Sequence, residues 1–207
     1  MKFQACVFIL IIVPVFLQAQ DTTGTTEKSW SCTLEADYYF VPDNHFDPTL
    51  TAYIDHKSLH LEARYNYEDF NTLSIFAGRT WAKDGDFSYA ITPMAGIAYG
   101  DSKGILPGLE LTASYSKFNL YSENEYLLDF KGKENNFLYS WTQLSASVLK
   151  NAQAGIVAES LRLYKTKFDM QKGVYAEYAP GNFIFDVYCL NPFSKYNYWV
   201  GSISFQF

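Results

Sequence analysis

Apolar and polar residues alternate with a period of two along almost the whole chain after residue 29. The stretch LHLEARYNYE, which begins at Leu59, shows this best: two leucines, an alanine and two tyrosines alternate with histidine, glutamate, arginine, asparagine and glutamate. Successive side chains of a β-strand point to opposite faces, so the pattern indicates strands with one apolar and one polar face. The sequence therefore predicts an all-β fold.

Clusters of Gly, Pro, Asn and Asp separate the alternating runs and define the expected strands. We expect twelve strands, with ten or eight as alternatives if some breaks are bulges or kinks. The expected ranges are 30–41, 50–55, 59–68, 72–81, 87–99, 109–116, 119–128, 137–149, 156–165, 173–179, 183–190 and 197–207. Pro93 lies inside one of them, where a ladder donor is lost, so we expect a bend or bulge there.

Composition and the first residues limit where such a chain can work. The 207 residues include 17 Tyr, 17 Phe and 4 Trp, which is typical of a folded chain, and the formal net charge is −6. No basic stripe is visible, so no nucleic-acid partner is expected. Lys2, an apolar run from Ala5 to Leu17 and the small Ala19 indicate a secretory signal peptide over 1–20, because the run is too short for a spanning helix.

Alternation alone does not say which face of a barrel is inside. A soluble periplasmic lipocalin-like binding barrel buries its apolar face, whereas a membrane barrel turns that face to lipid. The aromatic residues gather near the ends of the expected strands, as at Trp30, Trp81, Tyr99 and Trp199. Aromatic rings prefer the membrane–water boundary, so this placement favours the membrane barrel and leaves the soluble barrel as the alternative.

The last expected strand, YNYWVGSISFQF, is apolar at every second position. Trp199, Gly201, Ile203, Phe205 and Phe207 share one face. A strand that ends at an aromatic carboxy-terminus resembles the closing strand of bacterial outer-membrane β-barrels. The resemblance implies that these positions, with Gly201 the weakest, form a signal read by the β-barrel assembly machinery. LHLEARYNYED and TPMAGIAYGDSKGILPG also look like segments of uncharacterised outer-membrane barrels.

We therefore expect a closed antiparallel transmembrane β-barrel over 30–207, in the lipid bilayer of the cell outer membrane, after a polar lead-in at 21–29. An even number of strands puts both chain ends on the periplasmic side, with the longer connections facing outward. Cys32 and Cys189 fall on the first and eleventh strands. Two strand spacings, ~9.5 Å, exceed the ~7 Å that a disulfide tolerates, so we expect free, lipid-facing thiols.

The polar faces of the strands carry the charged residues that we expect to line the lumen. These are Glu35, Asp37, His60, Glu62, Arg64, Glu68, Glu110, Glu123, Glu125, Arg162, Glu177 and Asp186. An acidic wall in a confined space attracts positive charge, which favours a narrow pore for small solutes or ions. Alternatively, Arg64 and Arg162 bridge neighbouring carboxylates and the barrel is a plugged structural element. No cofactor is expected, and the oligomeric state stays open.

Catalysis and metal binding have weaker support in the sequence. An outer-membrane lipid-modifying enzyme needs a nucleophile and a base in contact, and Ser140 and His45 are the nearest candidates. Asp43, His45 and Asp47 have the spacing of metal ligands, but a solvated loop explains them better. We therefore assign no catalytic residue and no metal site.

Overall fold

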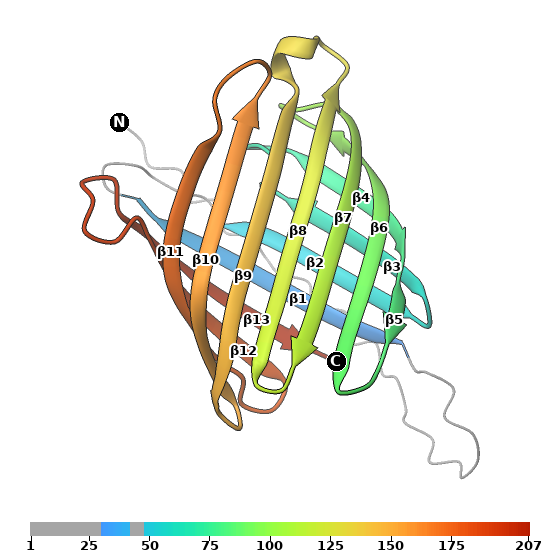
Figure 1. Cartoon of the computed structure of the whole chain (residues 1–207). Coiled ribbons are helices and arrows are strands. Elements are labelled where there is room, and N and C mark those ends of the chain that lie inside the picture. Colours follow the sequence, from blue (N-terminus) through green and yellow to red (C-terminus); the bar gives the residue numbers. More distant parts are fainter. Residues whose placement is uncertain (1–29, 42–47) are drawn as a thin grey trace, which may run out of the picture.

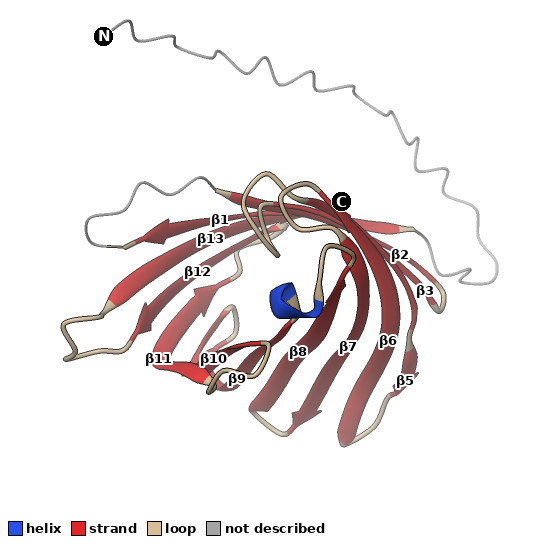
Figure 2. Ribbon diagram, turned by 90° about the horizontal axis from the view of Figure 1, so that it is seen from above, coloured by secondary structure: helices blue, strands red, loops and turns tan. Residues whose placement is uncertain are grey.

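The computed structural model describes residues 30–41 and 48–207, whose strands form one antiparallel sheet closed into a barrel (Figures 1 and 2). In chain order the strands are β1 Ser31–Phe40, β2 Thr49–His56, β3 Leu59–Tyr65, β4 Leu73–Arg79, β5 Trp81–Lys83, β6 Phe87–Tyr99, β7 Gly104–Tyr115, β8 Phe118–Asp129, β9 Phe137–Leu149, β10 Ala152–Leu163, β11 Asp169–Tyr178, β12 Phe183–Leu190 and β13 Tyr198–Gln206. β4 and β5 pair with the same neighbour, β6, and together occupy one position in the wall. The predicted closed barrel of 12 strands is thus confirmed.

The break between β4 and β5 lies opposite Pro93, where the sequence predicts a bend or bulge. The ladder to β6 is paired up to Gly78↔Met94 and resumes at Trp81↔Ile91 without a change of register. Proline has no N–H to donate, so the interruption appears in the partner strand while β6 itself runs on. The side chains of Thr80 and Thr92 bridge the gap through their hydroxyls, 2.9 Å apart.

Three predicted strand starts are wrong because Gly, Pro and Lys were interpreted as loop residues. β7 begins at Gly104 rather than at residue 109, β10 at Ala152 rather than at 156, and β11 at Asp169 rather than at 173. In β7, Pro107 pairs with Ala95 of β6, while the ladder to β8 passes from Ile105↔Leu128 to Gly108↔Glu125. The proline thus occupies a gap in one ladder, where its missing donor is tolerated.

The two ends of the barrel differ in their connections. At one end, here the turn end, short segments join the strands at 57–58, 84–86, 116–117, 150–151 and 179–182. At the other, the loop end, the described connections are 66–72, 100–103, 130–136, 164–168 and 191–197, and 130–136 carries the short 3₁₀-helix η1, Lys133–Asn135 (Figures 1 and 2). Such asymmetry is typical of bacterial membrane barrels.

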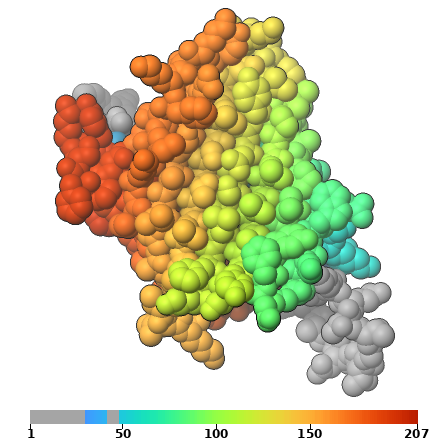
Figure 3. All heavy atoms as spheres, viewed as in Figure 1, coloured from blue at the N-terminus to red at the C-terminus, as the bar shows by residue number. Residues whose placement is uncertain are grey.

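The outward faces of the strands are apolar. Exposed side chains such as Leu73, Ile97, Ile156, Val174 and Ile203 cover the middle of the wall. Figure 3 shows this outer surface over β6 to β11 as a continuous layer of side chains. In the described part of the chain, no helix has the length and apolar character needed to cross a membrane.

The barrel closes where β1 pairs with β13, in a register that runs from Thr33↔Gln206 to Phe40↔Trp199. Beyond the last strand residue, the backbone N–H of Phe207 donates to the carbonyl of Cys32 at 2.9 Å. Trp199, Ile203 and Phe207 are exposed on the outer surface. Phe205 packs against Phe207 with ring centroids 4.7 Å apart, and Gly201 shares the same face.

Both described cysteines are free thiols, as the sequence predicts. Cys32 lies beside Phe207 at the turn end, whereas Cys189 pairs with Trp199 towards the loop end. Both cysteines lie on the outward faces of their strands, β1 and β12. The predicted signal peptide (1–20), the lead-in (21–29) and the loop residues Asp43, His45 and Asp47 lie outside the described residues.

Candidate functional site in the barrel lumen

The structure places almost all of the predicted lumen residues on inward faces. Glu35, Asp37, His60, Glu62, Arg64, Glu110, Glu123, Glu125, Glu177 and Asp186 point inward from the strands, and Glu68 points inward from the connection at 66–72. Among the described strand residues, Arg64 is the only arginine or lysine in this position. Carboxylic acid side chains therefore outnumber arginine and lysine on the inward faces of the described strands.

Arg162 is a correction to the prediction, because it lies on the outer surface. Arg162 pairs with Leu138 of β9. Two residues earlier, Ser160 pairs with Ser140 on the outer face, and Arg162 shares that outward phase. Near the loop end its Nε donates to the carbonyl of Thr166, 3.2 Å away. Alternation has a strict period of two, so Arg162 and the inward Glu159 cannot share a face. Reasoning from sequence missed Glu159.

Glu159 is held at the loop end by Tyr198, whose hydroxyl donates to the carboxylate. The alternation along β10 would have identified Glu159 as inward-facing, because it lies two residues after the buried Val157 and so shares its face.

Arg64 is the centre of one half of the lumen. Its guanidinium is buried and contacts the carboxylates of four residues. Nε and Nη2 each lie 2.5 Å from Glu62 Oε2, and Nη1 lies 2.7 Å from Glu123 Oε1, 3.0 Å from Glu125 Oε2 and 3.7 Å from Glu68 Oε1. One cation thus holds carboxylates from β3, from β8 and from the 66–72 connection together across the lumen.

Two aromatic rings enclose the same guanidinium. Its carbon lies 4.5 Å from the centre of the Tyr67 ring and 4.4 Å from that of Phe76, in cation–π contact. Phe76 belongs to an apolar cluster that fills the space towards the loop end. The cluster consists of Phe76, Met94, Ala98, Leu106, Leu127 and Phe137. We call Arg64, its four carboxylates and this cluster the packed side.

The sequence pattern placed Tyr67 on the apolar face of its strand, and this is wrong. β3 ends at Tyr65, and Asn66 adopts a left-handed conformation with φ 59°, which interrupts the alternation. Tyr67 therefore turns into the lumen, where its hydroxyl donates to Glu123 Oε2 at 2.9 Å. Burial raises the pKa of the neighbouring Glu68 carboxyl above its ordinary value, and the Arg64 guanidinium opposes that shift.

The other half of the lumen contains a cavity of about 210 Å³. It is lined by Glu35, Asp37, Tyr39, Tyr53, Tyr67, Tyr121, Glu123, Tyr139, Trp141, Gln143, Glu177, Ile184, Asp186, Tyr188, Val200, Ser202 and Ser204. We call this cavity and its lining the open side. Tyr67 and Glu123 form its boundary with the packed side.

Hydroxyl groups hold two carboxylates of the open side, those of Glu35 and Asp37. Glu35 accepts from Ser204 at 3.0 Å and from Tyr53 at 3.3 Å. Asp37 accepts from Thr49 at 2.9 Å. These bonds fix the carboxylate positions, and none of them brings a positively charged group to the carboxylates.

Two more cavities lie at the loop end. One of about 660 Å³ is bordered by Glu159, Asp169 and Tyr198, and one of about 420 Å³ by Glu68, Lys131 and Leu163. Neither has a described lining residue in common with the 210 Å³ cavity. Tyr139, which lines the 210 Å³ cavity, and Tyr198, which lines the 660 Å³ cavity, both pack against one apolar cluster. The cluster consists of Trp141, Val157, Tyr175, Tyr188, Leu190 and Val200.

Of the two candidate enzyme residues, Ser140 and His45, only Ser140 lies within the described residues. Ser140 lies on the outer face of β9, where its hydroxyl donates to Asn124 Oδ1 at 2.8 Å. His60 points into the lumen from β3, with Asp55 Oδ1 2.7 Å from its Nδ1 and Glu62 Oε1 2.5 Å from its Nε2. Ser140 and His60 thus lie on opposite faces of the wall.

Comparison with solved structures shows what kind of barrel this is. A structure described as "KdgM porin", and another described as "KdgM porin in complex with disordered oligogalacturonate", each superimpose with a TM-score of 0.59 at 16% sequence identity, covering 86% of this chain and 99% of that chain. A third, described as "Unveiling the Mechanism Behind the in-meso Crystallization of Membrane Proteins", gives a TM-score of 0.55 at 12% identity, covering 86% of this chain and 83% of the other.

No protein-family model matches the chain, and no curated protein sequence does. The likeness is therefore one of fold. Together with the apolar outer surface and the polar lumen, it shows that the chain has the closed antiparallel β-barrel fold seen in KdgM porin.

Proposed function

We propose that the barrel is a narrow channel for small solutes with a preference for cations. The observation that carries the proposal is the 210 Å³ cavity, in which the carboxylates of Glu35 and Asp37 are held by hydroxyl groups instead of by a counter-charge. A confined acidic wall lowers the energy of an entering cation and raises that of an anion.

The same charge distribution argues against acidic solutes. The ligand named for one KdgM porin structure is oligogalacturonate, which is a chain of uronic acids and hence a polyanion. In this chain Arg64 is the only inward arginine or lysine of the described strands, and four carboxylates already surround it. We infer that a polyanion is repelled here and that the solute class differs from the one named for that porin.

A plugged structural barrel is the second candidate. The packed side fills half of the lumen, and the described residues that line the cavities of the two ends form separate sets. A channel through this barrel therefore has to connect these separate cavities.

We further propose that Trp199, Gly201, Ile203, Phe205 and Phe207 serve as the signal for the β-barrel assembly machinery, and that the turn end faces the periplasm. The outward position of these side chains on the closing strand supports this, because a recognition signal must be accessible before the barrel closes. The same orientation agrees with short periplasmic turns and longer outer loops.

Planar-bilayer recording in a KCl gradient tests the channel. We expect a zero-current potential that shows preference for K⁺ over Cl⁻. The triple variant Glu35→Gln, Asp37→Asn, Asp186→Asn removes charge from the cavity lining and should reduce that preference. Asp84→Asn, in the exposed turn 84–86, removes a charge outside the lumen and should leave it unchanged.

Two results would contradict the proposal. The first is unchanged ion preference in the triple variant. The second is the absence of current from barrels that show the heat-dependent gel mobility of a folded membrane barrel, which would instead support the plugged barrel.

A further inference from the structure

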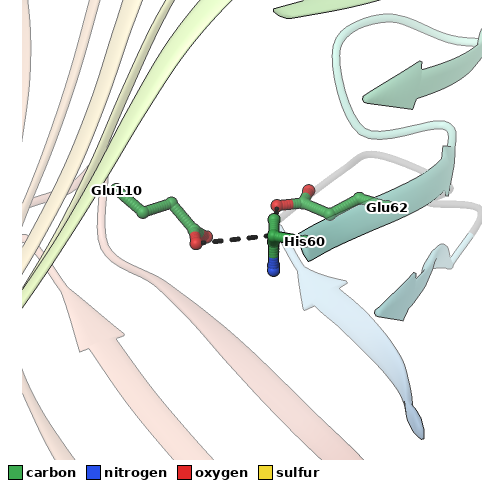
Figure 4. Close-up of side chains that lie close together, drawn as sticks. All are labelled: His60, Glu62 and Glu110. Atoms are coloured by element: carbon green, nitrogen blue, oxygen red, sulfur yellow. Dashed lines mark hydrogen bonds and ion pairs between the residues drawn. The ribbon is translucent and has the colours of Figure 1, made fainter. Parts of the chain in front are cut away.

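Three side chains meet in the lumen near the turn end. His60 and Glu62 come from β3, and Glu110 reaches them from β7, across the interior (Figure 4). His60 Nε2 lies 2.5 Å from Glu62 Oε1 and 3.7 Å from Glu110 Oε2. The three potential ligand atoms all lie within 4.8 Å of one another.

The histidine is oriented by a carboxylate behind it. Asp55 Oδ1 lies 2.7 Å from His60 Nδ1 and accepts the proton of that nitrogen. In a neutral ring the lone pair is then on Nε2, which faces the carboxylate oxygens of Glu62 and Glu110. Two acceptor atoms 2.5 Å apart require a proton or a metal ion between them.

Each carboxylate is also held through its other oxygen. Glu62 uses Oε2 to bind Arg64 and turns Oε1 to the histidine. Glu110 accepts from the Tyr121 hydroxyl through Oε1, at 3.0 Å, and turns Oε2 to the histidine. Metal sites in proteins show this arrangement, in which outer partners fix the orientation of every ligand.

We propose that His60, Glu62 and Glu110 bind a divalent transition-metal ion such as Zn²⁺ in the lumen, with Asp55 as the positioning residue for His60. One imidazole and two carboxylates suit Zn²⁺ and its neighbours in the first transition row better than Ca²⁺ or Mg²⁺. The site would use three protein ligands and leave the fourth position to water.

Binding requires only small movements of the ligands. Two ligands that are each ~2.0 Å from a tetrahedral zinc lie about 3.3 Å apart. Glu62 therefore has to withdraw from its 2.5 Å contact with His60, and Glu110 has to close slightly from 3.7 Å. Both are ends of flexible side chains.

The site is accessible from the turn end. The Asp55 side chain is 46% exposed, whereas that of His60 is 7% exposed, so the histidine lies just inside the opening. Tyr53 and Tyr121, which border the 210 Å³ cavity, contact the cluster, with the Tyr53 and His60 rings 6.4 Å apart. An ion bound there would sit beside the path proposed for solutes.

Calorimetric titration of ZnCl₂ into the chelator-treated, folded full-length barrel in detergent tests the site. We expect one Zn²⁺ per chain and no heat from Mg²⁺. His60→Gln should abolish binding. His56→Gln is the matched control, because His56 stacks on Trp30 at 4.4 Å on the outer face of the neighbouring strand. This variant should bind Zn²⁺ as the unmodified chain does.

The visible spectrum of bound Co²⁺ separates ligands from the positioning residue. Glu110→Gln should change the spectrum, because a ligand is lost. Asp55→Asn should weaken Zn²⁺ binding by roughly 10–100-fold and leave the Co²⁺ spectrum unchanged. Since Glu110→Gln and Asp55→Asn are independent variants, misfolding of His60→Gln, seen as lost heat-dependent mobility, does not prevent the test.

Absence of Zn²⁺ binding to the unmodified barrel would overturn the proposal, and so would equal affinities in the His60→Gln and His56→Gln variants. These measurements use no membrane current, so their outcome is independent of whether the barrel conducts.

Discussion

The packed side and the open side of the lumen both contain carboxylates, but these carboxylates have different partners on the two sides. On the packed side, Arg64 draws the carboxylates of Glu62, Glu123 and Glu125 to within 3.0 Å and leaves no free space between them. On the open side, hydroxyls of Ser204 and Thr49 hold Glu35 and Asp37 against the wall, beside a cavity of about 210 Å³.

The difference lies in the kind of hydrogen-bond donor that each side offers to its carboxylates. A guanidinium offers five donors in a fixed plane and so gathers several carboxylates at one point. A hydroxyl donates a single bond and leaves each carboxylate at its own strand. We expect substitutions on the packed side to affect mainly stability, and substitutions on the open side to affect mainly ion preference.

Arg64→Ala should have the largest effect on stability. It leaves buried carboxylates without their cation, so we expect the free energy of unfolding to fall by about 3–5 kcal/mol. Urea titration of the folded barrel in lipid vesicles measures this. Arg162→Ala, at the outer surface, should cost less than about 1 kcal/mol. Equal losses in the two variants would show that the packed side is not held by its charge.

Leu106→Ala tests the apolar part of the packed side. Leu106 is fully buried in the cluster with Phe76 and Leu127, so a cavity should form and the loss should be about 2–5 kcal/mol. Leu109→Ala, on the outer face of the same strand, should cost clearly less, because lipid can fill the space. The same urea titration compares the two. A larger loss at position 109 would contradict a solid packed side.

Gly96→Ala sharpens the comparison through a single methyl group. A Cβ at Gly96 would lie 2.5 Å from the Phe76 ring, so overpacking should cost about 1–3 kcal/mol. At Gly201 the nearest atom to a new Cβ is 3.6 Å away, on Phe40. Gly201→Ala should therefore be neutral or stabilise by up to about 1 kcal/mol. Thermal unfolding followed by gel mobility ranks the two variants, and a stabilised Gly96→Ala would be incompatible with close packing there.

Tyr188→Phe should give the smallest change. It removes the bond donated by Gln143 to the tyrosine oxygen, 2.9 Å long, at a cost of about 0.5–1.5 kcal/mol. The ring stays stacked on Tyr175, with centroids 5.3 Å apart. Tyr178→Phe, on the exposed outer face of β11, serves as control, with an expected change below about 0.5 kcal/mol. A loss above about 3 kcal/mol at Tyr188 would mean that the open side is as rigid as the packed side.

The alternation was sufficient to predict the barrel, because a period of two assigns faces wherever one face is charged. In β3 it places His60, Glu62 and Arg64 on one side, as in the structure. It fails where the chain leaves the β conformation, as at Asn66, after which Tyr67 turns inward.

The alternation could not predict other parts of the lumen. Phe76 and Leu106 point inward although their outward neighbours are apolar too, so hydropathy does not mark their face. The meeting of Glu110 with His60 depends on the width of the barrel and the register of strands that are distant in sequence. Arg162 was misplaced because its charge was given more weight than its phase relative to Val157.

The pairing of β1 with β13 has a consequence for the order of events during folding. The other ladders join strands that follow one another along the chain, with only the short β5 between β4 and β6, and such hairpins form locally. The closing ladder brings Ser204 beside Glu35, 169 residues away, and so carries a large loop-closure cost. Until that contact forms, the sheet is an open curl with two unpaired edges, each able to pair with another chain. Protection of the first edge until the last strand arrives therefore decides between a barrel and an aggregate.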